Sequence, residues 1–114
     1  MIQRHIRTPI MHRVVEHSGV LYLGGIVAED RSASMKGQTE QVLARVDALL
    51  SETGSDKSKI LTATLYITDM SLKDEMNEAW TAWLAPEILP SRSTIGVAEL
   101  GPKVLIEAVI TASK

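Results

Sequence analysis

Apolar residues in the first third of the chain form short runs bounded by turn residues, which is typical of β-strands. Residues 2–6 are a weak candidate strand and Arg13–His17 is a second. A turn signal at His17-Ser18-Gly19 separates the second from the apolar run Val20–Val27, so these two segments predict a β-hairpin. The polar stretch Ala28–Ser34 that follows predicts a loop.

A helical period follows this loop. Five apolar residues recur at the spacing of one face of a 3.6-residue helix: Val42, Leu43, Val46, Leu49 and Leu50. We predict a helix from about Met35 to Thr53, with Ser34 capping its first amides and Gly54 adopting the left-handed conformation that ends it. Ser55–Ser58 is then a short turn.

The second half of the chain again offers a strand and a helix. Ile60–Ile67 is rich in β-branched residues and too short for a typical helix, so it predicts a strand. Alternation places four of its residues on one side: Leu61, Ala63, Leu65 and Ile67. A second helix is predicted over about Leu72–Leu84, stopped by Pro86 and Pro90. Its inner face is expected to carry Met76, Trp80 and Trp83.

Two further strands, Arg92–Ala98 and Val104–Ala112, close the chain around a Gly101-Pro102 turn, and we expect them to pair as a hairpin. The element order is therefore β-β-α-β-α-β-β, with residues 2–6 as an extra N-terminal strand. This order predicts one α+β domain over residues 1–114, a single mixed β-sheet with two helices packed on one face.

Two helices cover only one face of such a sheet, and the other face also carries apolar side chains. These are Val20, Tyr22, Ile26, Leu105 and Val109. An uncovered apolar face usually binds a partner. The pattern therefore predicts that the chain forms oligomers.

Composition and charge argue against several classes of function. The 114 residues suit one domain, and the formal net charge of -2 lacks the basic balance of a dedicated nucleic-acid binder. The chain has no cysteine, which removes thiol nucleophiles and thiolate metal sites. No apolar run reaches the roughly 18 residues of a membrane span, and the N-terminus lacks the apolar middle of a signal peptide. We expect a cytoplasmic protein without membrane or nucleic-acid partners.

Two charged residues in the closing strands are candidates for chemistry. Glu107 is the only charged side chain between Val104 and Ser113, where a carboxylate either contacts a subunit or the sheet surface, or binds and activates a water. Arg92 offers a planar fork for a carboxylate, with an exposed or ion-paired arginine as the alternative. A closing hairpin would place Arg92 toward the end of the ladder that contains Glu107.

The remaining candidates carry weaker signals. His5, His12 and His17 lack metal-ligand spacing, so no metal site is predicted. The pair Gly24-Gly25 indicates either tight packing or a bulge where the backbone approaches a ligand. No histidine is placed beside Ser91, Ser93 or Thr94, which disfavours serine hydrolysis, and Trp80 and Trp83 are expected to pack in the core.

The closing segment consists of Pro90–Thr94 (PSRST) followed by Val104–Ala108 (VLIEA). This pattern resembles the C-terminal signature of the Rid/YjgF family of reactive intermediate deaminases. Residues 61–70 (LTATLYITDM) and 76–80 (MNEAW) resemble the family's central strand and the helix after it. Leu21–Gly25 lies where the family has its Ser-Gly strand, so the resemblance covers nearly the whole chain.

The resemblance implies a YjgF-like, chorismate-mutase-like fold, a homotrimer and clefts between subunits. It implies that Arg92 holds a substrate carboxylate and that Glu107 orients the attacking water, with backbone groups near Gly25 and Thr94 completing the cleft. The reaction it implies is hydrolysis of 2-imino or enamine acids to 2-keto acids and ammonia, with no metal or organic cofactor. Such substrates are released by pyridoxal-phosphate enzymes and amino-acid oxidases.

The chain departs from the family pattern at two places. Residues 8–13 (TPIMHR) contain no Tyr where typical members carry a GPY-like motif, and Gly24-Gly25-Ile26 replaces the usual Ser-Gly-Gln. His12 is a candidate polar group of the altered cleft, with an exposed histidine as the alternative. Two alternative functions are a regulatory trimer that binds a 2-keto acid without turnover and RNA cleavage, which the acidic net charge disfavours.

Overall fold

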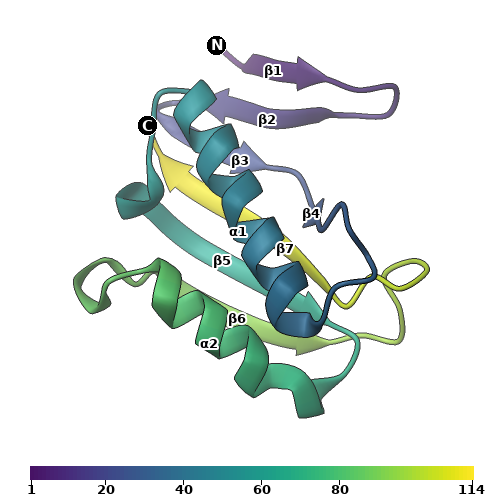
Figure 1. Ribbon diagram of the computed structural model, residues 1–114. Helices are drawn as coiled ribbons and strands as arrows, with labels where there is room; N and C mark the ends of the chain where they lie inside the picture. Colours follow the sequence, from purple (N-terminus) through teal and green to yellow (C-terminus); the bar gives the residue numbers. More distant parts are fainter.

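A mixed seven-stranded β-sheet forms one layer of the structure, and two α-helices form the other. The structure is a computed structural model that describes residues 1–114. Both helices lie on the same face of the sheet, α1 across its middle and α2 beside it over β5 and β6 (Figure 1). The predicted α+β class, with one mixed sheet and both helices on one face, is therefore confirmed.

The elements follow the predicted order with one added break. The strands are β1 (Gln3–Arg7), β2 (His12–His17), β3 (Val20–Leu23), β4 (Ile26–Val27), β5 (Ile60–Ile67), β6 (Ser91–Gly96) and β7 (Ile106–Ser113). The helices are α1 (Met35–Glu52) and α2 (Lys73–Trp83). Single 3₁₀ turns lie at Lys57–Lys59, Met70–Leu72 and Pro86–Ile88. None of the helices is both long and apolar enough to cross a bilayer.

The predicted closing hairpin is wrong. The strand order is β1-β2-β3-β7-β5-β6, with β4 also paired to β7, so β5 separates β6 from β7. β6 runs parallel to β5, to which α2 connects it, and β7 runs antiparallel to β5 on the other side. A strand-helix-strand segment favours parallel neighbours, whereas a hairpin needs a short loop. The connection 97–105 is long enough to pass the end of β5 instead.

A one-residue bulge interrupts the predicted strand Val20–Val27. Tyr22 pairs with Thr111 and Ile26 pairs with Ala108, so the register with β7 shifts by one residue at Gly24-Gly25. A shift of one residue exchanges the two faces of a strand. Ile26 is consequently buried against the helices and does not lie on the uncovered face as expected.

A second register shift, between Ile60 and Thr62, alters the start of β5. It buries Ile60 and leaves Leu61 47% exposed, so Leu61 does not share a side with Ala63 and Leu65 as predicted. From Ala63 onward the alternation holds, because Ala63, Leu65 and Ile67 are all buried. Hydrophobic pattern alone does not locate such bulges, since the residues on either side remain apolar.

The core between sheet and helices is aliphatic, apart from Trp80. Ser34 caps α1 by accepting a hydrogen bond from the Gly37 amide, and Gly54 follows the helix with a φ of 85°. On α2, Met76 and Trp80 are buried and Trp83 is half-buried against the same core. The predicted helix caps and inner faces are therefore confirmed.

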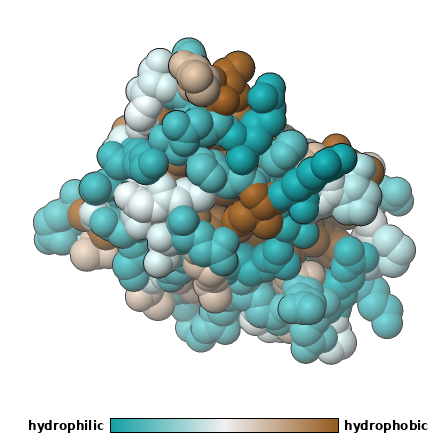
Figure 2. Space-filling model, turned by 90° about the horizontal axis from the view of Figure 1, so that it is seen from above, coloured by the Kyte–Doolittle hydropathy of each residue, from teal (hydrophilic) through white to brown (hydrophobic).

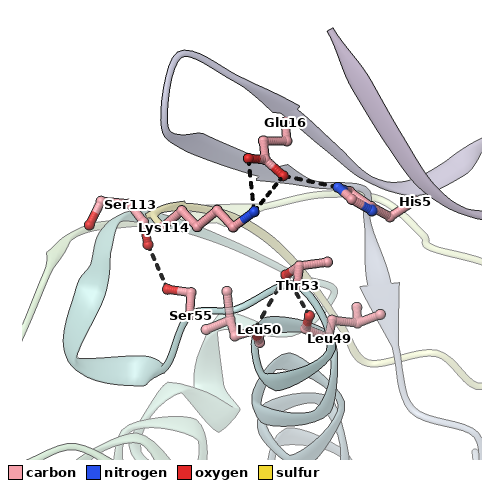
Figure 3. Close-up of polar contacts among 8 residues, drawn as sticks. All are labelled: His5, Glu16, Leu49, Leu50, Thr53, Ser55, Ser113 and Lys114. Carbon is pink, nitrogen blue, oxygen red and sulfur yellow. Dashed lines mark hydrogen bonds and ion pairs between the residues drawn. The ribbon is translucent and has the colours of Figure 1, made fainter.

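The β1 edge of the sheet is mostly hydrophilic, as Figure 2 shows for the top of the molecule. Beneath this edge, the buried carboxylate of Glu16 forms hydrogen bonds with the imidazole of His5 and the ammonium group of Lys114 (Figure 3). His5 Nε2 lies 3.0 Å from Glu16 Oε1, and Lys114 Nζ lies 3.2 Å from Oε2. These contacts join strands β1 and β2 to the residue that follows β7. The His5 bond, followed by the Lys114 bond, lowers the pKa of Glu16 below its ordinary 4.5.

Glu16→Gln is expected to lower the free energy of unfolding at neutral pH. Because the folded-state pKa is lowered, the ionised carboxylate stabilises the fold above pH 4.5 and loses that effect as the pH falls through the folded value. The difference between wild type and variant should therefore shrink in acid, as measured by urea unfolding across the pH range. Glu29→Gln, at an exposed position, is the matched control. A Glu16 effect that is independent of pH would contradict the role of these ion pairs.

Candidate functional site

Arg92 lies on β6 and faces α2. It pairs with Ala63 in the parallel ladder, and its guanidinium carbon is 5.2 Å from the centre of the Trp80 ring. No carboxylate or carbonyl of the chain accepts a hydrogen bond from this guanidinium. Burial lowers the pKa of Arg92 below its ordinary value, although an arginine remains charged at neutral pH. The side chain is thus a half-buried cation with its N–H donors unused.

Thr94 accompanies Arg92 on the helix-covered side of the sheet, and Asn77 lies on α2, the helix whose Trp80 contacts Arg92. Thr94 follows two residues later on β6 and pairs with Leu65, so it faces the same way. Asn77 lies one helical turn before Trp80 on α2, and its Oδ1 is buried without a hydrogen-bond partner. We call Arg92, Thr94, Trp80 and Asn77 the arginine edge. The hydrophobic pattern predicts packing for Trp80 and no role for Asn77, for which the one available signal is its i, i+3 spacing from Trp80.

Asn77→Leu is expected to stabilise the fold by about 1 kcal/mol, because a buried oxygen without a partner costs roughly 1–3 kcal/mol. If Asn77 Oδ1 serves a ligand at the arginine edge, the same variant should bind that ligand more weakly. Chemical unfolding and ligand titration on one preparation measure both effects. Asn77→Asp is the matched control that keeps the acceptor. Destabilisation by the leucine would show that the oxygen is already satisfied in the fold.

Glu107 lies on the opposite face of the sheet. Its neighbours Ile106 and Ala108 are fully buried against the helices, so its half-exposed side chain projects from the uncovered face. The bulge brings Gly25 against it: a Cβ on Gly25 would lie 2.5 Å from Glu107 Oε2 and 2.9 Å from Cδ. Of the two interpretations of Gly24-Gly25, tight packing or a bulge near a ligand, the structure thus shows a bulge whose backbone packs tightly against the candidate carboxylate. We call Glu107 and Gly25 the glutamate face.

One chain does not bring the arginine edge and the glutamate face together. Arg92 is level with Ala63 and Ile110 across the strands, whereas Glu107 is level with Tyr66 and Ile95. The two rows are three residues apart, which is about 10 Å along a strand. Because the side chains also project from opposite faces, the expected shared ladder of Arg92 and Glu107 is wrong. The intervening β5 is the cause.

His12 joins neither group. It begins β2 opposite Arg7, and alternation places it on the side of Val14 and Glu16, which is the helix-covered side. It forms no hydrogen bond with Arg92, Thr94, Gly25 or Glu107. The structure also brings no three His, Asp or Glu side chains together in an arrangement that could hold a metal ion.

One surface groove of about 240 Å³ lies between α1 and α2, away from both groups. Its lining residues are Glu40, Leu43, Ala44, Asp47, Ala79, Ala82 and Trp83. The Trp83 Nε1–H donates a 2.8 Å hydrogen bond to Asp47, which fixes the indole at one wall. No residue predicted to act in chemistry lines this groove.

Comparison with known proteins agrees with this architecture along the whole chain. The family model described as Endoribonuclease L-PSP matches residues 5–114. A RutC family protein from Haemophilus ducreyi is 39% identical over 113 residues, covering 99% of this chain and 97% of that protein. Reactive Intermediate Deaminase A, chloroplastic, from Arabidopsis thaliana is 34% identical over 96 residues, covering 82% of this chain and 51% of that protein.

Solved structures agree as well. The crystal structure of a YjgF-family protein from Neisseria meningitidis matches with a TM-score of 0.95 at 36% identity, covering 100% of this chain and 95% of that one. The alignment therefore includes both the arginine edge and the glutamate face. Given the match to the family model over residues 5–114 and these close relatives, the chain belongs to the YjgF/Rid family.

Proposed function

We propose that this protein hydrolyses reactive 2-imino acids and their enamine tautomers to 2-keto acids and ammonia. We place the reaction in a cleft between subunits of a homotrimer and assign it no cofactor. The observation that carries the proposal is the unpaired, half-buried guanidinium of Arg92, which is suited to a carboxylate-bearing substrate. The similarity to a protein named as a reactive intermediate deaminase supports the choice of reaction.

Arg92 supplies binding. A guanidinium can donate two parallel hydrogen bonds to a carboxylate, which fixes the plane of the substrate as well as its position. In a partly desolvated site this ion pair is stronger than in water. The same positive charge offsets the negative charge of the substrate carboxylate, which would otherwise make the neighbouring carbon less electrophilic.

Glu107 positions the attacking water. Its carboxylate accepts a hydrogen bond from a water molecule and orients the water oxygen toward the imine carbon. A bond forms between that oxygen and the carbon, the carbon–nitrogen bond then breaks, and the protons of the water pass to the leaving nitrogen. A protonated imine and one water thus give a keto acid and ammonium. An iminium carbon is already electrophilic, so orientation and electrostatics suffice.

The trimer accounts for the separation of the two groups. Each chain carries the arginine edge on one face of its sheet and the glutamate face on the other, so neither group is a complete site. A subunit contact that brings Arg92 against Glu107 of the partner subunit would complete it. The uncovered face supports such a contact, because Val20, Val109 and the 49% exposed Tyr22 lie on it. A monomer by light scattering at micromolar concentration would overturn this part of the proposal.

The test is a competition assay. An amino-acid oxidase generates imines from a panel of amino acids, semicarbazide traps them, and the purified protein competes for them. We expect wild type to suppress trapping and Arg92→Ala to lose at least about 10²-fold in kcat/KM. Suppression by both proteins would remove Arg92 from the mechanism. Keto-acid binding without suppression would instead support a regulatory trimer, and salt-sensitive RNA binding would support a nucleic-acid role.

A further inference from the structure

The Arg92 guanidinium contacts an aromatic ring and forms no ion pair with a carboxylate of the chain. Its guanidinium carbon lies 5.2 Å from the centre of the Trp80 ring, within the range of a cation–π contact. Other cations of the chain are held differently: Lys36 pairs with Glu78 at 2.9 Å, and Lys114 pairs with Glu16. Lys57 also lies over a ring, that of Trp83, but donates a 2.8 Å hydrogen bond to a carbonyl.

What a guanidinium can still bind depends on the group that it already contacts. A carboxylate partner would occupy two of the five N–H donors and neutralise the charge. A ring face attracts the cation through its quadrupole and leaves every N–H donor free. The ring also restricts the rotamers of a long side chain before a ligand arrives, which lowers the entropy cost of binding.

Trp80 is itself firmly placed. It is 4% exposed, and its ring centre lies 5.8 Å from that of Trp83 at an interplanar angle of 57°. Trp83 is in turn tied to α1 through the 2.8 Å hydrogen bond from its Nε1 to Asp47. A continuous series of contacts therefore runs from α1 through both indoles to the guanidinium.

We propose that Trp80 is a positioning residue for Arg92: its ring holds the guanidinium at the arginine edge with the N–H fork open to a planar carboxylate. The inference rests on the proposed function for the nature of the ligand. It extends that function by assigning specificity, because a fixed fork favours a planar, two-oxygen anion over a single-point anion or an uncharged imine. Trp80 acts through Arg92 and does not touch the reacting atoms.

Nuclear magnetic resonance of the ¹⁵N-labelled full chain tests the stacking directly. The Arg92 Nε–H signal, assigned by its absence in Arg92→Lys, should be shifted by the ring current of Trp80. The shift should disappear in Trp80→Met and largely persist in Trp80→Phe. Trp83→Met is the matched control, because it removes an indole of the same helix that is not the ring beneath Arg92. An unshifted Arg92 signal in wild type would overturn the inference whatever the protein binds.

Binding of pyruvate, measured by calorimetry on the same proteins, tests the consequence. Trp80→Met should weaken pyruvate binding about tenfold, Trp83→Met, which removes only the ring beside Trp80, should weaken it less, and Trp80→Phe should stay near wild type. Urea unfolding identifies any variant that is not folded, and Trp80→Phe keeps the test valid if Trp80→Met is not. If the loss of pyruvate binding parallels the loss of folding stability in all three variants, Trp80 is only a packing residue. A shifted Arg92 signal with no binding of pyruvate or any imino acid by wild type would overturn the proposed function and leave the stacking in place.

Discussion

Gly25→Ala is expected to abolish imine hydrolysis while leaving the protein folded. The added Cβ would lie 2.5 Å from Glu107 Oε2 and 2.9 Å from Cδ, both closer than atoms of this kind approach in proteins. The carboxylate stands at the end of a flexible side chain and can turn away at little cost to the fold. It would then no longer orient a water, so we expect a loss of about 10²–10⁴-fold in kcat, the range for a displaced general base.

Gly24→Ala is the matched control for this substitution. Its Cβ would meet Met11 Sδ at 3.2 Å, and a methionine side chain adjusts readily. We therefore expect Gly24→Ala to retain most activity and Gly25→Ala to retain almost none, with similar unfolding curves for both. Full activity in Gly25→Ala would show that the observed position of Glu107 is not the one used in catalysis.

Mixing two inactive variants is expected to restore activity. Arg92→Ala keeps an intact glutamate face, and Glu107→Gln keeps an intact arginine edge. If each cleft takes one group from each of two subunits, then mixed trimers contain clefts with both intact groups. Random assembly from equal amounts should recover about a quarter of the wild-type activity, because one arrangement of four at each cleft is complete. The measurement is kcat after the variants are unfolded together and refolded.

The controls separate shared clefts from clefts within one chain. Each variant refolded alone should stay inactive, as should either one refolded with the double variant Arg92→Ala, Glu107→Gln. If Arg92 and Glu107 acted within a single chain, co-refolding would recover nothing, because every chain lacks one of them. Recovery that appears only after joint refolding would therefore support the intersubunit site.

Local signals predicted the elements well. The Ser18-Gly19 turn has φ values of 52° and 77°, which suits the two-residue hairpin that its sequence indicates. Ser34 and Gly54 mark the ends of α1, and the prolines after α2 follow its last turn. Each of these features depends on residues within one turn of the chain, so the sequence contains the information directly.

Strand neighbours and bulges could not be predicted in the same way. A hydrophobic period tells which face of β7 is buried, but it does not reveal that β5 lies beside it instead of β6. A single extra residue at Gly24-Gly25 reversed the orientation of Ile26, and a register shift did the same for Leu61. The candidate residues Arg92, Glu107 and Gly25 could be named from sequence, whereas their division into two groups required the topology.

Both tryptophans of the chain lie on α2, and each has a cation above its ring. The intrinsic tryptophan fluorescence of the protein therefore comes from a single helix. Emission from Trp80 should change when an anion binds the guanidinium above its ring and alters the charge there, while Trp83, fixed by Asp47, should change little. A fluorimeter and unlabelled protein thus suffice to follow occupancy of the arginine edge, and Trp83→Phe would leave one emitter, placed beneath the guanidinium.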